Sequence, residues 1–233
     1  MENLHASNLY SFYGKSPVLQ GVSFDLKPGE FMSVLGRNGV GKTTLLKSIM
    51  GLTDGCRGKM TFGQVDLLKC STPQRALQGI GYIPQGREVI PHFTVRENIL
   101  MGTFARADGK RNIPDYLFDM FPILREFISR RGGDLSGGQQ QQLAIARALA
   151  MDPKILILDE PTEGIQPNIV KQIEDVIIRL NRERGLGIIL VEQNVPFARA
   201  ASDRVLVLDK GRVVLDGTSA ELTDSVVEEH LTF

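Results

Sequence analysis

The sequence predicts an α/β fold with a mixed core sheet, antiparallel strands at its edge and an inserted α-helical lobe. Three observations lead to this prediction: short runs of branched apolar residues that end in polar loops, helix-capping signals after such loops, and a middle stretch with helical spacing. The chain has 233 residues, of which 42% are hydrophobic, so it can form one sizeable core.

Three apolar runs mark the buried strands of a parallel core. They are FMSVL at 31–35, ILIL at 155–158 and IILV at 188–191. Each run is followed by polar residues and then by a predicted helix, which is the order of elements in parallel β-α units, where ligands bind at the carboxyl ends of the strands. Residues 1–30 and 204–216 show short runs and turn signals instead, which predict antiparallel strands. The second of these stretches reads as a hairpin that turns at Asp209-Lys210-Gly211.

The middle of the chain, about residues 88–134, predicts a helical lobe between two core strands. Thr94 and Glu97 form a capping box that opens a helix, and residues 113–128 place aromatic and aliphatic side chains at helical spacing. We therefore predict one domain over residues 1–233. Its core comprises residues 1–87 and 135–233.

The composition argues against several classes of protein. Lys+Arg and Asp+Glu are balanced at 27 each, so no nucleic-acid partner is expected. The two cysteines and three histidines are scattered, which favours reduced thiols and gives no metal-ligand cluster. The N-terminus shows no export signal, and no apolar segment reaches the roughly 18 residues needed to span a bilayer. We expect a protein that is soluble in isolation, with any membrane role supplied by a partner.

A phosphate-binding loop is the strongest chemical signal. Residues 36–43 fit G-x-x-x-x-G-K-[ST] between a predicted strand and a predicted helix, and a chance glycine-rich turn is the alternative. The glycines let backbone amides face the phosphates, Lys42 neutralises the β- and γ-phosphates, and the Thr43 hydroxyl ligates Mg²⁺. The predicted nucleotide-binding residues are Gly36, Arg37, Asn38, Gly39, Val40, Gly41, Lys42, Thr43 and, on the α-phosphate, Thr44.

Two adjacent carboxylates, Asp159 and Glu160, follow the run at 155–158. Carboxylates at the end of a buried strand are costly unless a cation or partner compensates for them. We predict that Asp159 holds Mg²⁺, directly or through water, and that Glu160 polarises the attacking water as general base. A surface turn with solvated acids is the alternative.

A second anion-binding feature lies much later in the chain. Ser136 and Gln139 form a capping box, with Gly137 and Gly138 in the first turn of the predicted helix. Bare amides at a helix start attract anions, but this start has no lysine and forms only half of a site. Another copy of the fold would have to supply the nucleotide.

LSGGQ at 135–139, together with the phosphate loop and ILILDE, resembles the ATP-binding cassette superfamily over nearly the whole chain. The resemblance implies a P-loop NTPase fold, ATP and Mg²⁺ as cofactors, and ATP hydrolysis. It also implies that two cassettes dimerise head to tail, with each ATP between one phosphate loop and the other subunit's signature helix. The implied contacts to the partner's nucleotide come from Ser136, Gly137, Gly138 and Gln139.

Further residues match motifs of this family. Tyr13 in FYG resembles the aromatic residue that stacks on adenine, with Val18 nearby, although Tyr10 and Phe12 are rivals and any of the three could belong to the core. Gln85 in YIPQG resembles the glutamine that contacts Mg²⁺ and water and that links the core to the helical lobe. A turn glutamine is the alternative for this residue.

Two positions depart from the family pattern. The switch residue is usually a histidine, but LVEQN places Gln193 there. Glutamine can donate a hydrogen bond to a γ-phosphate and cannot gain a proton near neutral pH, so Gln193 is expected to position groups while Glu160 acts as the base. Gln166 in PTEGIQP stands where many relatives have aspartate, so the usual contacts across the dimer do not carry over. Both departures allow an ATP site that is catalytically weaker than its neighbour in a dimer of two different cassettes.

The length of the chain and the segments it does not contain indicate which class of cassette protein it resembles. The sequence shows no long coiled-coil insertion, second cassette or transmembrane stretch, and we expect no appended domain, so the resemblance implies a detached cassette of a bacterial importer. YIPQGREVIPHFTVRENIL and VEQN resemble the branched-chain amino-acid importer group. GRNGVGKTTLLKSIMGL, RRGGDLSGGQQQQLAIARAL and PTEGIQP look like the ATPase subunit of urea importers. No residue of the chain is expected to bind urea itself.

The importer resemblance also implies partners and a location. The partners are a second ATPase subunit, two transmembrane permease subunits and, indirectly, a periplasmic binding protein, at the cytoplasmic face of the inner membrane. The surface at 85–98 is the expected docking face. A homodimer and a heterodimer both remain open. A non-transport ATPase, such as an iron–sulfur assembly cassette, is the rival class, and Gln193 keeps open a regulatory subunit that only binds ATP.

Overall fold

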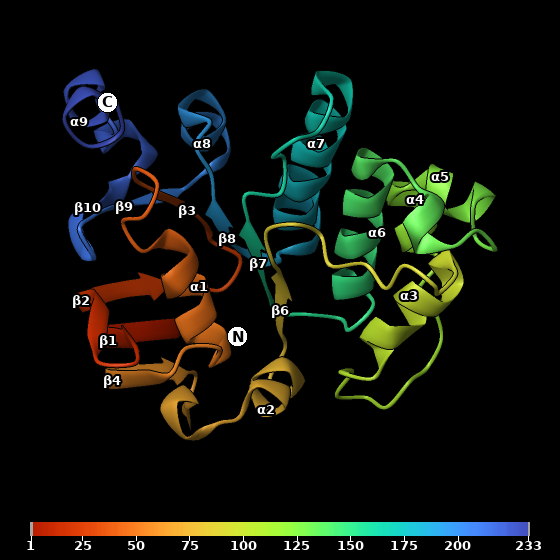
Figure 1. Cartoon of the computed structure of the whole chain (residues 1–233), viewed down its shortest axis with the longest axis horizontal. Coiled ribbons are helices and arrows are strands. Elements are labelled where there is room, and N and C mark those ends of the chain that lie inside the picture. The colour runs from red at the N-terminus through yellow and green to blue at the C-terminus, as the bar shows by residue number, and fades with distance from the viewer. Residues whose placement is uncertain (1, 233) are drawn as a thin grey trace.

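The computed structural model describes residues 2–232, which form two β-sheets and layers of helices (Figure 1). The core sheet has the strand order β10-β9-β3-β8-β7-β6. Its strands are β3 Phe31–Leu35, β6 Ile80–Ile83, β7 Ile155–Asp159, β8 Gly187–Val191, β9 Arg204–Asp209 and β10 Arg212–Thr218. All pairs are parallel except that of β9 with β10, so the sheet is mixed, as predicted.

The three apolar runs are confirmed as core strands. Every residue of β3, β7 and β8 is buried, because helices or a second sheet cover both faces of the core sheet. The hairpin is confirmed as well. Lys210 and Gly211 connect β9 to β10 with φ of +46° and +76°, the left-handed conformation that a tight two-residue hairpin turn requires.

The antiparallel strands at the N-terminus are confirmed, but they belong to a second sheet. That sheet has the order β2-β1-β4-β5, with β1 Leu4–Tyr13, β2 Ser16–Leu26, β4 Gly55–Phe62 and β5 Val65–Asp66. The antiparallel edge of the core sheet is therefore β10 alone. The pairing of β1 with β4 joins segments far apart in sequence, which local patterns do not reveal.

Helices follow the core strands, and both predicted capping boxes are present. Thr94 caps α3 and Ser136 caps α6 through their side chains. The α-helices are α1 Lys42–Met50, α2 Thr72–Leu77, α3 Val95–Thr103, α4 Tyr116–Met120, α5 Pro122–Glu126, α6 Gly137–Leu149, α7 Pro167–Arg184, α8 Val195–Ala201 and α9 Asp224–His230. The 3-10 helices are η1 Leu67–Lys69, η2 Gly132–Asp134 and η3 Ser219–Glu221.

The core sheet separates two apolar layers, because successive side chains of a strand point to opposite faces. In β7, Ile157 faces the layer that contains α1 and the β1–β2–β4 sheet, whereas Leu156 and Leu158 face the layer of α6 and α7. Figure 1 shows α1 between the two sheets and α6 and α7 on the other side of the core sheet. The helix α1 and Val40 of the loop before it thus pack in the apolar layer between the two sheets.

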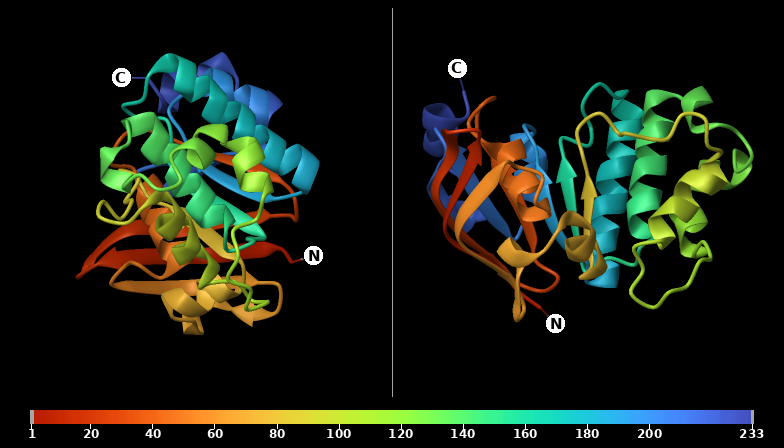
Figure 2. Two further views of the ribbon diagram at one scale, coloured as in Figure 1. Left: turned by 90° about the vertical axis from the view of Figure 1, so that its right-hand side faces the viewer. Right: turned by 60° about the horizontal axis from the view of Figure 1, so that its bottom comes forward.

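Residues 88–134 carry α3, α4, α5 and η2, and α3 packs against α6 on the side away from the first sheet (Figure 2). The helical spacing at 113–128 produces two short helices, because the chain bends at Phe121 and restarts at Pro122, which has no N–H to donate. None of the helices within residues 2–232 combines the length and apolarity that crossing a bilayer needs. We propose that about residues 88–134 form a helical lobe.

Candidate active site

The loop between β3 and α1 depends on three glycines. Gly36, Gly39 and Gly41 have φ of +147°, +82° and +112°, a region that residues with a side chain rarely adopt. At Gly36 and Gly41 an added Cβ would also collide with neighbouring groups. The chain therefore makes a tight loop that ends at the first residue of α1, in the strand–loop–helix context that the sequence predicts.

Lys42 crosses the inside of this loop. Its Nζ donates hydrogen bonds to the carbonyl oxygens of Gly36 (2.8 Å) and Arg37 (3.1 Å), and it lies 3.9 Å from Oε1 of Glu160. Burial lowers the pKa of Lys42, and the carboxylates of Glu160 and Asp159 oppose that shift. The loop thus encloses one lysine amine that faces two acids.

Asp159 and Thr43 form an oxygen-rich corner beneath the loop. The Thr43 hydroxyl donates to Oδ1 of Asp159 at 3.1 Å, while Oδ2 of Asp159 is buried and has no hydrogen bond within the described residues. Burial raises the pKa of Asp159, and the bond from Thr43 opposes the shift. A buried carboxylate oxygen without a partner is costly, and Mg²⁺ prefers oxygen ligands, so this corner fits Mg²⁺. Among residues 2–232 no group of three His, Cys, Asp or Glu could hold a metal, so nucleotide oxygens and water would complete the shell.

The Asp159→Asn variant tests this corner. We expect the Mg²⁺ concentration for half-maximal ATP hydrolysis to rise at least about tenfold, because the amide removes the negative charge that faces the cation. A Mg²⁺ titration of phosphate release measures the shift, and nucleotide binding without Mg²⁺ is the control. An unchanged Mg²⁺ dependence would mean that Asp159 is not a ligand.

The carboxylate of Glu160 accepts hydrogen bonds from other polar side chains of the site. It follows β7 with φ of +46°, and its Oε1 accepts a hydrogen bond from Nε2 of Gln193 at 2.9 Å. Nε2 of Gln85 donates to its Oε2 at 3.4 Å, and Gln193 also donates to Oδ1 of Asn38 at 3.2 Å. The structure therefore brings together Glu160, Gln85 and Gln193, the three residues predicted to be catalytic, although they come from three different loops.

The contacts of Gln193 lead to a pH prediction. Glutamine does not titrate, so this residue adds no inflection to the pH–rate profile. We expect Gln193→His to introduce one near pH 6–7, roughly the range of an ordinary histidine pKa. Initial rates of ATP hydrolysis between pH 5.5 and about 9 would detect it, with Gln193→Ala as the non-titrating control. Identical profiles for the histidine and alanine variants would argue against contact with the reacting groups.

The sequence predictions do not include two acidic residues of the site, Glu163 and Glu192. Oε2 of Glu163 accepts from Gln85 at 2.7 Å, a shorter bond than the one to Glu160. Glu192 is 5% exposed, and its carboxylate accepts from the Thr162 hydroxyl (2.5 Å) and from the backbone N–H of Gln193 (2.7 Å). Glu192 directly follows the buried strand β8, as Asp159 ends β7, so the rule on carboxylates at strand ends could have found it. Glu163 lies in the loop after β7, where no such rule applies.

A cavity of about 300 Å³ opens over these groups. Its lining residues are Val18, Asn38, Gly39, Gly41, Lys42, Thr43, Thr44, Gln85, Glu160, Glu163 and Gln193. Tyr13 is 39% exposed at the end of β1 and does not line the cavity, and Val40 is buried in the apolar layer under the loop. The Arg37 side chain donates to the carbonyl of Glu229 in α9, a contact that the sequence did not predict.

The start of α6 forms a separate feature. Oγ of Ser136 accepts from the N–H of Gln139 at 3.4 Å, and Oε1 of Gln139 accepts from the N–H of Ser136 at 3.0 Å. Gly138 is buried, and a Cβ there would collide with Ile169 of α7. Neither Ser136 nor the three residues after it line the cavity of Lys42. The two predicted anion-binding features therefore lie at separate places on one chain.

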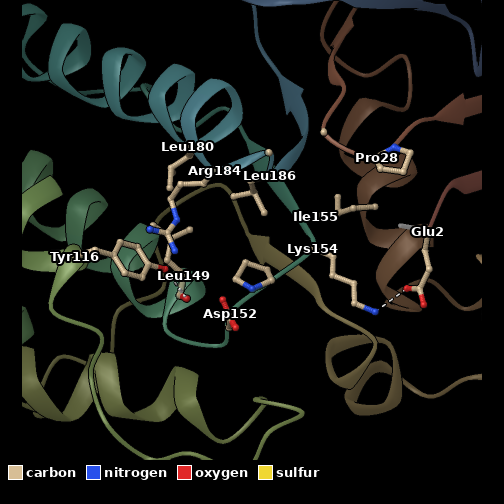
Figure 3. A pocket seen from close by; sticks show the side chains of 13 residues that line it. Glu2, Pro28, Tyr116, Leu149, Asp152, Lys154, Ile155, Leu180, Arg184 and Leu186 are labelled. Carbon is tan, nitrogen blue, oxygen red and sulfur yellow. Dashed lines mark hydrogen bonds and ion pairs between the residues drawn. The ribbon is translucent and has the colours of Figure 1, made fainter.

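Another cavity, of about 460 Å³, lies at the amino ends of the core strands (Figure 3). Its charged side chains already have partners: Nζ of Lys154 lies 2.7 Å from Oε2 of Glu2, and the Arg184 guanidinium stacks over the Tyr116 ring at 3.8 Å. None of the predicted site residues lines it. The predicted site residues therefore gather at the cavity of the phosphate loop and not at this one.

Comparisons with known proteins agree with this geometry. Residues 19–163 match the family model described as ABC transporter. The chain is 39% identical to the high-affinity branched-chain amino acid transport ATP-binding protein BraG of Pseudomonas aeruginosa, over 91% of each chain. It is 38% identical to the probable branched-chain amino acid transport ATP-binding protein LivF of Archaeoglobus fulgidus, over 95% of this chain and 94% of that one.

Solved structures extend the comparison. The dimeric post-hydrolysis state of the ATP-binding cassette MJ0796, bound to ADP and Pi, matches with a TM-score of 0.81 and 27% identity over 93% of this chain and 98% of that one. A nucleotide-free cassette from an ABC transporter matches with a TM-score of 0.82 and 25% identity over 98% of both chains. The chain belongs to the ABC transporter family and is one of its ATP-hydrolysing subunits.

Proposed function

We propose that this chain powers a bacterial importer, and that it does so as one of two cassettes that enclose ATP between them. The observation that carries the proposal is the separation of the two anion-binding features. Lys42 and Glu160 share one cavity, whereas Ser136 caps a helix outside it. The dimeric state of a similar cassette with ADP and Pi supports the proposal that the second feature serves a partner's nucleotide.

In this proposal the phosphates of ATP lie in the loop before α1, where the Lys42 amine turns from the loop carbonyls toward the β- and γ-phosphates. Mg²⁺ bound at Thr43 and Asp159 would neutralise charge on the same phosphates. The Glu160 carboxylate takes the proton of the attacking water, whose oxygen bonds to the γ-phosphorus as the bond to the ADP oxygen breaks. Gln193 and Gln85 hold that carboxylate in place.

Adenine would lie beyond the loop, against the β1–β2 end of the first sheet. Val18 lines the cavity there, and Tyr13 exposes 39% of its surface close by in sequence, which leaves its ring available for stacking. Asp54 holds the turn between them, because its Oδ2 accepts from the N–H of Gly14 at 2.7 Å. The exposure supports Tyr13 as a surface residue and not as part of the core, but it does not distinguish Tyr13 from Tyr10, which is 36% exposed.

The proposed substrate of the importer is urea. The motifs GRNGVGKTTLLKSIMGL, RRGGDLSGGQQQQLAIARAL and PTEGIQP support it. The names of the two relatives given above favour branched-chain amino acids as the second candidate. The chain has no part in choosing between them, because in the proposed assembly the permeases and the binding protein contact the substrate.

The proposed partners are a second cassette, two transmembrane permeases and a periplasmic binding protein, with the cassettes at the cytoplasmic face of the inner membrane. Residues 85–98 are the proposed docking face for the permeases. Exposed apolar side chains on and beside this face support the proposal, since such patches mark interaction surfaces. They are Phe93 (38% exposed), Met101 (42%) and Phe104 (63%).

Uptake of labelled urea and labelled leucine, in cells that lack this chain, tests the proposal. Complementation with the wild-type chain should restore urea uptake, and complementation with Glu160→Gln should not. Restoration of leucine uptake alone would favour the second candidate. Unchanged uptake of both substrates, with ATP hydrolysis intact in the purified protein, would favour a non-transport ATPase.

A further inference from the structure

Arg87 lies in the loop between β6 and α3, two residues after Gln85. Gly86, Arg87 and Glu88 have successive φ values of +89°, +71° and +46°. Two of these residues have side chains, for which the left-handed region is unfavourable. The turn directs the Arg87 side chain across to the loop after β7, where its Nη2 donates to the carbonyl oxygens of Glu163 (3.3 Å) and Gly164 (3.5 Å).

The same guanidinium lies against the start of α6. A Cβ added to Gly137, the first residue of that helix, would lie 3.0 Å from Nη1 and 3.2 Å from Nη2 of Arg87. The missing side chain of Gly137 therefore makes room for the cation. Arg87 thus joins three segments: its own loop, the loop after Glu160 and the first turn of α6.

In the isolated chain the Arg87 guanidinium is balanced by the two backbone carbonyls of Glu163 and Gly164 and not by an acid. A helix start carries partial positive charge, which repels a cation. The first turn of α6 contains no acidic residue, and within residues 2–232 no Asp or Glu forms an ion pair with Arg87. A polyanion at the helix start would make this placement of the cation favourable. The α6 amides, the Ser136 hydroxyl and the guanidinium would then all bind the same anion.

We propose that Arg87 supplies the positive charge of the half-site at the start of α6, and that it contacts the terminal phosphate of ATP held by a partner cassette. The proposal rests on the two-cassette ATP site of the proposed function. It adds to that site the cation that the Ser136 segment lacks. Because Arg87 also bonds Glu163 and Gly164, it ties the half-site to the loop that follows Glu160 in its own chain.

The experiment uses the Glu160→Gln protein, alone and with its partner cassette, and measures by analytical ultracentrifugation the ATP concentration for half-maximal dimerisation. Adding Arg87→Gln should raise that concentration at least about tenfold, because one charge-assisted contact to phosphate is lost. Arg87→Lys keeps the charge and should lose less. Arg131→Gln, an exposed arginine close to the signature segment in sequence, is the matched control and should stay within about twofold.

Binding of a fluorescent ATP analogue to the monomer shows whether weaker dimerisation comes from the contact across the dimer or from weaker ATP binding in the chain's own site. Arg87→Gln should leave the monomer's affinity unchanged, since its own ATP site uses Lys42. An equal loss in monomer binding, or dimerisation equal to that of the Arg131→Gln control, would overturn the role of Arg87 and leave the two-cassette site intact. Failure of the Glu160→Gln protein itself to dimerise with ATP, with and without the partner, would overturn both proposals.

Discussion

The Glu160→Gln variant is expected to lose at least about a hundredfold in steady-state ATP hydrolysis while it still binds ATP. The amide keeps the size of the side chain and the contact with Gln193, but it cannot accept the proton of the attacking water. The variant should therefore accumulate as an ATP-bound pair of cassettes. Phosphate release and sedimentation, measured on the same sample, report the two effects.

Glu163→Gln is the matched control for this prediction. Its carboxylate also lines the cavity and accepts from Gln85, at 2.7 Å, but no ion pair joins it to Lys42 within the described residues. We expect a loss of less than about tenfold for this control. Wild-type turnover in Glu160→Gln would remove Glu160 from the role of general base.

Lys42→Ala is expected to weaken ATP binding at least about a hundredfold, because several charge-assisted contacts to the phosphates are lost together. The amine also donates to the carbonyls of Gly36 and Arg37, so the empty loop should lose order as well. Calorimetric titration with ATP measures the affinity, and thermal unfolding without ATP measures the effect on the loop.

Lys59→Ala provides the comparison, since Lys59 is an exposed lysine on β4 in the first sheet. It should bind ATP as the wild type does. An ATP affinity of Lys42→Ala within about threefold of this control would contradict the assignment of the loop as the phosphate site.

The parts of the fold that could be predicted depend on local signals. The runs of β3, β7 and β8 are fully buried, so their apolar residues are continuous in the sequence. The capping boxes of α3 and α6 are contained within four residues each. The phosphate loop is likewise one continuous segment, because the backbone itself forms the site.

The parts that could not be predicted depend on contacts between distant residues. The bond between Gln85 and Glu163 spans 78 positions, and the one between Arg37 and Glu229 spans 192. The helix α9 has seven residues and none is buried, so its apolar pattern is weak. β1 pairs with β4 and β2 pairs with β1, so both strands belong to the first sheet and not to the core sheet, and no sequence motif marks these pairings.

We propose that two polypeptides hold each ATP, one through Lys42 and the other through Ser136. The structure of the Glu160→Gln protein with ATP and its partner cassette tests it most directly. In that structure Oγ of Ser136 should lie within about 3 Å of a γ-phosphate oxygen whose nucleotide occupies the other chain's loop. A pair in which the Ser136 segment faces solvent, while ATP fills both loops, would contradict it.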